Sequence, residues 1–283
     1  MKQGGDAVEN EQAVARHYAH GSLEQTILSA LAAADKDVDR LTPRDLAPVD
    51  EFHVGGRPAT IAFAAEFGLR PGMRLLDIGC GLGGAARFFA GEHDCRVSGI
   101  DLSAEYVDVA NALAVRVGLG ERASFAPGSA LALPFEAGSF DAAYMFHVGM
   151  NIENKSRLFA EVRRVLAPSG RFGIYDVMRL ADGELSYPVP WASGPESSFI
   201  ADAASYRRWL EAAGFEVLKE RNRREFALEI FAQMRARGAV SAPPPLGLHI
   251  VMGANAALKV KNMIADIGAG LIAPTEMISR VAA

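Results

Sequence analysis

The sequence predicts an α/β protein in which a mostly parallel, seven-stranded sheet carries helices on both faces. Short apolar segments alternate with helical patterns through the middle of the 283-residue chain, as in successive βαβ units. Half of the residues are hydrophobic, which is enough to bury a large core. A glycine-rich turn at residues 79–84 joins the first strand to the first helix of this pattern, and such turns are typical of parallel sheets that bind a ligand at their carboxyl edge.

Each predicted strand is a short apolar segment, and six are expected at residues 74–79, 96–101, 123–126, 140–146, 171–176 and 215–219. A last segment, 275–281, is expected to return to the sheet as the seventh strand. Hydrophobic residues recur at helical spacing between the strands, so helices are expected at residues 85–90, 104–117, 158–166 and 203–213. Pro168 and Gly170 end the third of these helices.

Two regions lie outside this alternation. The first contains a helical stretch at residues 23–31, and the second contains helical patterns interrupted by a proline-rich linker at residues 241–247. We therefore expect an N-terminal cap at 1–70, a core at 71–225, and a helical lid with the final strand at 226–283. The two flanks are expected to form a mostly helical cap over the site at which such a sheet binds its ligand.

The overall charge argues against nucleic-acid and membrane partners. The formal net charge is −5 and the isoelectric point is about 5.7, so no global basic field attracts nucleic acid or anionic lipid. The N-terminus is polar, no apolar stretch reaches membrane-spanning length, and there are only two cysteines. We therefore expect a cytoplasmic protein.

The glycine turn and two aspartates are the most informative local features. Residues 75–84 read L-L-D-I-G-C-G-L-G-G, and Asp101 ends the next strand, where a carboxylate can accept both hydroxyls of a ribose. An NAD enzyme would share those features, but three details disfavour it. The glycines follow G-x-G-x-G, Asp77 lies inside the strand before them, and the segment A-L-A-L-P-F-E-A-G-S-F-D at 130–141 has no dinucleotide counterpart.

Four motifs together resemble the class I S-adenosylmethionine (SAM)-dependent methyltransferases. They are D-I-G-C-G-x-G-G, G-I-D-L-S, L-P-F-x-x-x-S-F-D and V-L-A-P-S-G-R, within about residues 71–219. The resemblance is to the small-molecule branch similar to sarcosine/dimethylglycine and tocopherol/ubiquinone-type methyltransferases. It implies a Rossmann-like fold, SAM as cofactor and S-adenosylhomocysteine (SAH) as product.

The resemblance also implies roles at the first strand. Gly79, Gly81 and Gly83 would surround the methionine moiety of SAM. Asp77 would help to hold its ammonium group, because a carboxylate is well placed beside the ammonium and sulfonium charges.

The adenosine moiety would lie at the next two strands. Asp101 would accept the ribose hydroxyls, Leu102 would flank the adenine, and Ala130 and Leu131 would lie along its edge. The sequence departs from the family pattern at Ser129, where an aspartate usually receives the adenine amino group. A serine hydroxyl can accept that hydrogen bond without the assistance of charge, so somewhat weaker SAM binding is expected.

A general base is needed only if the acceptor must lose a proton, and three residues are candidates. His147 follows the fourth strand, close to the expected path of the methyl group, although an ordinary edge residue is the alternative. His53 begins an H-x-G-G sequence with Gly55 and Gly56, which resembles a loop that closes over SAM in the same relatives. Paired glycines before a helix also suit a carboxylate, and a plain capping turn is the alternative. Tyr18 lies in an H-Y segment whose tyrosine contacts the SAM carboxylate in those relatives, or else packs in the cap.

The acceptor is expected to be a small molecule with an apolar part. Trp191, Asn151 and Met252 are the candidate contacts, because a cap over a SAM site also supplies the acceptor pocket. No metal site is expected, since no histidine pair joins a cysteine or carboxylate cluster. A methyltransferase acting on RNA or protein and a non-catalytic SAM-binding subunit are the alternatives, and a homodimer is compatible with the sequence.

Overall fold

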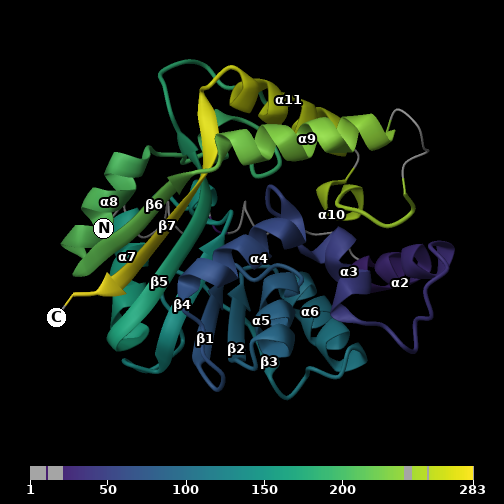
Figure 1. Ribbon diagram of the computed structural model, residues 1–283, viewed down its shortest axis with the longest axis horizontal. Coiled ribbons are helices and arrows are strands. Elements are labelled where there is room, and N and C mark those ends of the chain that lie inside the picture. Colours follow the sequence, from purple (N-terminus) through teal and green to yellow (C-terminus); the bar gives the residue numbers. More distant parts are fainter. Residues whose placement is uncertain (1–10, 12–21, 239–243, 254, 283) are drawn as a thin grey trace.

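The computed structural model describes residues 11, 22–238, 244–253 and 255–282 (Figure 1). Its strands are β1 (Arg74–Ile78), β2 (Arg96–Asp101), β3 (Ala123–Pro127), β4 (Phe140–Phe146), β5 (Leu166–Arg179), β6 (Phe215–Asn222) and β7 (Ile272–Val281). They form one sheet in the order β3-β2-β1-β4-β5-β7-β6. The predicted seven-stranded, mostly parallel sheet is confirmed, with β7 antiparallel to both of its neighbours.

Helices cover both faces of this sheet. They are α2 (Leu23–Ala33), α3 (Pro43–Asp50), α4 (Gly56–Phe67), α5 (Gly84–Glu92), α6 (Ala104–Arg116), α7 (Lys155–Val165), α8 (Ala203–Ala212), α9 (Arg224–Gly238), α10 (His249–Met252) and α11 (Ala256–Gly268), with 3₁₀ turns at Gly149–Asn151 and Pro195–Ser197. Successive strand residues point to opposite faces. Leu75 therefore packs in the buried cluster beneath α4, α5 and α6, and Leu76 packs in the cluster beneath α7 and α8.

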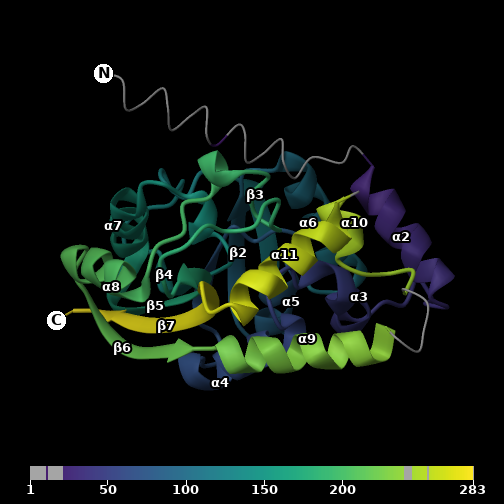
Figure 2. The same ribbon diagram turned by 90° about the horizontal axis from the view of Figure 1, so that it is seen from above.

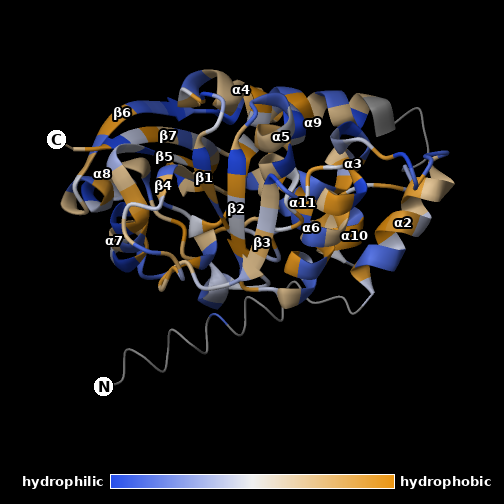
Figure 3. Ribbon diagram, turned by 90° about the horizontal axis from the view of Figure 1, so that it is seen from below, coloured by the Kyte–Doolittle hydropathy of each residue, from blue (hydrophilic) through white to orange (hydrophobic). Residues whose placement is uncertain are grey.

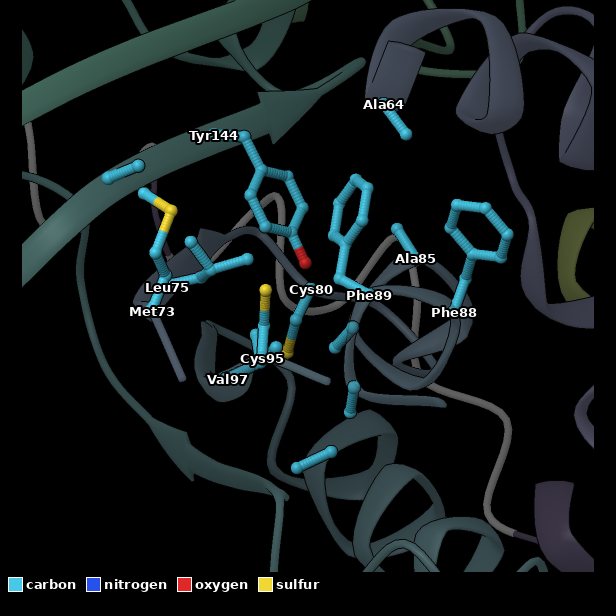
Figure 4. Packing of buried hydrophobic residues seen from close by; sticks show 14 of the residues in the cluster. Ala64, Met73, Leu75, Cys80, Ala85, Phe88, Phe89, Cys95, Val97 and Tyr144 are labelled. Atoms are coloured by element: carbon cyan, nitrogen blue, oxygen red, sulfur yellow. The ribbon is translucent and has the colours of Figure 1, made fainter. Parts of the chain in front are cut away.

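The face beneath α4 and α5 is strongly aromatic. Tyr144 of β4 and Phe89 of α5 lie side by side in it (Figure 4), with ring centroids 4.7 Å apart. Phe63 of α4 packs on Gly173 of β5 so closely that a β-carbon there would lie 2.2 Å from the ring. Although α4 belongs to the segment 1–70, it therefore packs directly on the sheet.

The other flanking helices cover one end of the sheet. α9 and α11 pack against each other and against β7, and α10 contacts α2 (Figure 2). The hydropathy colouring in Figure 3 shows stripes of hydrophobic and hydrophilic residues on the peripheral helices, which is typical of helices with one buried side. Within the described ranges, no helix is long and apolar enough to cross a membrane.

The strand β5 differs most from its predicted limits. It begins at Leu166, five residues before the predicted start, because Leu166 already pairs with Phe140 of β4. The pairing then shifts register between Phe140 and Ala142. Ser169, at φ +62°, accommodates this irregularity in the segment where the sequence predicted only the end of a helix.

Candidate functional site

A cavity lies where the strand order reverses, at the carboxyl ends of β1, β2 and β4. Its walls come from the turns after these strands, from the loop between α3 and α4, and from α10. This is the position at which open α/β sheets bind their ligands. Of the predicted site residues, the lining includes Asp77, Gly79, Gly81, Asp101, Leu102, Ala130, Leu131, His53, His147 and Asn151.

The glycine turn forms the floor of the cavity. Gly81 has φ +53°, and nothing lies within 4 Å of the position a β-carbon would take, so its backbone is open to a ligand. Gly83 has φ +76° and caps α5, with Phe125 only 2.5 Å from such a β-carbon. Gly83 therefore supports the turn from behind and does not line the cavity.

Asp77 carries a buried carboxyl group that forms no ion pair with the described residues. Its neighbours Asp50 and Glu51 each have one: Arg87 is 2.6 Å from Asp50, and Arg57 is 2.9 Å from Glu51. No described lysine, arginine or histidine forms an ion pair with Asp77, which is 3% exposed. Burial raises the pKa of Asp77 to about 8, and the charges of Asp101 and Glu51 add to the rise.

Asp101 is held at the end of β2 by backbone donors. Gly81 donates its N–H to Oδ2 and Ser103 donates its N–H to Oδ1, both at 2.9 Å. Burial raises the pKa of Asp101, against these hydrogen bonds. The carboxylate thus ties the glycine turn to the next turn and remains in the cavity wall.

Ser129 lies next to the cavity without lining it. Its hydroxyl group donates to Oε1 of Glu11 and accepts the N–H of Leu131 at 3.0 Å. Glu11 itself lines the cavity. The sequence alone did not identify Glu11, because nothing in its local pattern relates it to residue 129.

His147 uses both ring nitrogens to hold the backbone. Nδ1 lies 2.9 Å from the carbonyl oxygen of Tyr175, and Nε2 accepts the N–H of Val54 at 3.2 Å. Since a carbonyl only accepts and an N–H only donates, the proton is on Nδ1. Burial lowers the pKa of His147 to about 3, and the neighbouring His53 adds to this effect. These bonds do not support the expectation of a general base and indicate a brace between β4, β5 and the loop before α4.

The ring of His53 is hydrogen-bonded to described residues through Nε2 alone, whereas the ring of His147 uses both nitrogens. Nε2 of His53 lies 3.1 Å from the carbonyl oxygen of Gly56 and 3.1 Å from Oγ1 of Thr60. Because the Thr60 hydroxyl donates to Glu51 at 2.6 Å, it accepts from His53, so the proton is on Nε2. No described residue bonds to Nδ1, which keeps its lone pair. Burial lowers the pKa of His53 to about 4, and the charge of Arg57 adds to the effect.

The paired glycines of the same loop do not line the cavity. The ring of Phe226 would lie 2.5 Å from a β-carbon at Gly55, so α9 covers that residue. The N–H of Gly56 donates to the carbonyl of His53 at 3.0 Å. The expectation that Gly55 and Gly56 cradle a carboxylate is therefore not supported, and Tyr18 lies outside the described residues.

The three expected acceptor contacts have different positions. Asn151 lines the cavity and donates Nδ2 to the carbonyl of Trp191 at 2.7 Å. Trp191 is 3% exposed and packs with Val189 and Phe231 in the core beneath α9 and α11. Met252 also lies outside the lining. Trp191 therefore does not line the cavity. Its side chain packs in a hydrophobic cluster, and its backbone carbonyl accepts the hydrogen bond from Asn151, which does line the cavity.

Several lining residues had no sequence motif to identify them. Phe52, Tyr106, Glu153 and Val251 come from four separate segments, and only the packing of those segments brings them together. The one local signal that could have pointed to this part of the lining is the acidic pair before His53, of which Asp50 lines the cavity. Within the described part of the chain, no group of three histidine, cysteine or acidic side chains is arranged to hold a metal.

A family model described as "Methyltransferase domain" matches residues 76–174. The sterol 24-C-methyltransferase ERG6B of Gibberella zeae is 31% identical over 163 residues, which are 55% of this chain and 42% of that protein. The chain thus spans less than half the length of this curated relative.

Solved structures share the fold over nearly the whole chain. The geranyl diphosphate C-methyltransferase of Streptomyces coelicolor A3(2), solved with Mg²⁺, geranyl diphosphate and SAH, is 17% identical, with a TM-score of 0.69 over 96% of this chain and 98% of that one. The 4+2 cyclase SpnF is 23% identical, with a TM-score of 0.63 over 93% and 94%. These likenesses concern the fold, and the family match concerns the sequence. Residues 76–174 therefore match a methyltransferase-domain model, and they lie within a chain that has a Rossmann-like α/β fold.

Proposed function

We propose that this chain is a SAM-dependent methyltransferase that methylates a small-molecule acceptor with an apolar part. The observation that carries the proposal is the meeting of three features in one cavity. They are the carboxyl group of Asp77, which has no described ion-pair partner, the open backbone at Gly81, and the carboxylate of Asp101. The methyltransferase domain match supports the same assignment.

The chemistry of these groups fits SAM. Asp77 offers negative charge to an ammonium or sulfonium group, and Gly81 permits close approach to the backbone. Asp101 has lone pairs left for the two ribose hydroxyls after accepting two backbone N–H groups. Leu102 and Leu131 supply apolar walls for an adenine ring.

When bound, SAM supplies a methyl group on a sulfonium that a nucleophile attacks in line. The work left to the protein is to align the acceptor and to exclude water. Phe52, Phe146 and Val251 line the cavity from the loop after α3, the end of β4 and α10. Their side chains suit an acceptor with an apolar part.

The charge of the lining favours a neutral or cationic acceptor. Its carboxyl side chains are Glu11, Asp50, Asp77, Asp101 and Glu153. Arg87 balances the charge of Asp50 and burial raises the pKa of Asp77 to about 8, so the repulsion that a phosphorylated acceptor would meet comes mainly from Glu11, Asp101 and Glu153.

We propose His53 as the general base for an acceptor that must lose a proton. Its Nδ1 lone pair is the basic site that the hydrogen bonds of the ring leave, and Thr60 and Glu51 fix the ring. For an acceptor that supports turnover, His53→Ala should lower kcat by about two to four orders of magnitude, with the Kd for SAH little changed. His147→Ala should instead lower the free energy of unfolding by about 1–3 kcal/mol, because it strands two backbone groups. Loss of turnover in a fully stable His147→Ala protein would reverse these roles.

Ligand-induced stabilisation tests the cofactor assignment. SAM and SAH should raise the melting temperature, because a ligand at 100 times its Kd adds about 2.7 kcal/mol to the native state. Asp101→Ala should remove most of this shift by leaving the ribose hydroxyls without an acceptor. The exposed Asp108→Ala on α6 is the matched control. Stabilisation by NADH and not by SAM would overturn the proposal.

A further inference from the structure

Glu11 and Ser129 meet beyond the end of β3. They are 118 positions apart in the chain, yet the hydroxyl of Ser129 donates to the carboxylate of Glu11. Glu11 lines the cavity together with Leu102, Ala130 and Leu131. A carboxylate is therefore present beside the position where the sequence has serine in place of an aspartate.

We propose that Glu11 accepts the amino group of the adenine ring, as a carboxylate supplied from a distant segment. This inference rests on the proposed binding of SAM. The single hydroxyl hydrogen of Ser129 is directed to Glu11, and its oxygen already accepts the N–H of Leu131. Ser129 thus has little capacity left for an amino group, and its role is to hold Glu11.

The carboxylate of Glu11 can still accept hydrogen bonds from an amino group. Two carboxylate oxygens offer about four acceptor sites, and the bond from Ser129 occupies one. A charged acceptor also binds an amino group more strongly than a hydroxyl does. The other lining carboxylates have their own positions: Asp77 lies within β1, and Asp101 ends β2, where Gly81 and Ser103 hold it. Asp50 is paired with Arg87, and Glu153 lies just before α7.

The proposed contact makes a specific prediction about ligand choice. Hypoxanthine carries a carbonyl oxygen where adenine carries the amino group, and Glu11 would repel that oxygen. The chain should therefore bind SAH more tightly than S-inosylhomocysteine, its deaminated analogue, by about tenfold or more. A glutamine at position 11 can either accept from an amino group or donate to a carbonyl, so Glu11→Gln should bring the ratio of the two Kd values close to one.

Isothermal titration of the full chain with both ligands tests the inference. The double variant Glu11→Gln, Ser129→Asp should recover the preference for SAH, because it restores a carboxylate at this edge. The exposed Glu136→Gln, outside the cavity, should keep the wild-type ratio. A wild-type ratio in Glu11→Gln, with SAH still bound, would overturn the role of Glu11 and leave the cofactor assignment intact. Absence of SAH binding to the wild-type chain would instead overturn the proposed function and this inference with it.

Discussion

At the scale of single residues, the cavity contains a carboxyl group whose ionised form is disfavoured by burial. Asp77 is buried without a described ion-pair partner, and its pKa is raised from an ordinary 3.8 to about 8. A group of this kind favours the folded state when protonated. It loses that contribution as the pH rises through the interval between the two values. Strain of this sort at a ligand site is relieved when a cation binds.

The raised pKa of Asp77 predicts that the effect of Asp77→Asn on stability depends on pH. The difference in free energy of unfolding should grow in favour of the variant as the pH rises from about 4 to about 8, because the unfolded wild type gains a carboxylate that the folded state disfavours. The same variant should lose stabilisation by SAH, because an amide offers no negative charge. Urea unfolding across pH 4–9, with and without SAH and with the exposed Asp108→Asn as control, measures both effects. Parallel pH profiles for wild type and variant would contradict it.

At the scale of elements, the turn after β4 is fixed by a buried carboxylate of β5. Asp176 accepts the N–H of Val148 at 2.9 Å, the N–H of Gly149 at 3.1 Å and the hydroxyl of Tyr206 at 2.9 Å. Val148 in turn packs against Gly79, where a β-carbon would lie 2.4 Å from its side chain. The geometry of the glycine turn therefore depends on this clamp.

Gly149→Ala should disturb the clamp and the cavity together. Its β-carbon would lie 2.3 Å from the Asp176 carboxylate and 2.5 Å from the Tyr206 hydroxyl, so the variant should lose about 1–3 kcal/mol of stability to overpacking. SAH should also bind more weakly, because Val148 shifts against the glycine turn. Gly268→Ala, where nothing lies within 4 Å, is the matched control. Thermal unfolding and SAH titration supply the measurements, and equal behaviour of the two variants would refute the coupling.

At the scale of the whole molecule, the sheet is completed by the C-terminal strand. β7 lies between β5 and β6 and pairs antiparallel with both. All but one of its residues are buried. The chain therefore brings its last strand into the interior of the sheet, where it joins β6 to the rest.

Removal of residues 271–283 should prevent cooperative folding, because β5 and β6 would each lose a partner and expose apolar surface. Removal of residues 282–283 alone leaves the strand intact and should have little effect. Circular dichroism during thermal unfolding distinguishes the two. A cooperative transition in the variant that lacks residues 271–283 would show that the first six strands suffice for folding.

The sequence by itself determined the α/β class, the succession of the seven strands and the core helices along the chain, and the glycine turn with Asp77 and Asp101. These features follow from hydrophobic periodicity and from residues close together in the chain, which report local backbone geometry and burial directly. The family resemblance rests on the same short motifs, and the domain match covers them.

Only the tertiary structure decided what the polar side chains bond to. His147 lies at the predicted edge, yet Val54, 93 residues away, occupies its Nε2. Ser129 meets Glu11 across 118 residues, and Trp191 packs in the core behind the cavity. Hydrogen-bond partners from distant segments leave no periodic signal in either segment, because their meeting depends on how the helices pack and on which strands pair.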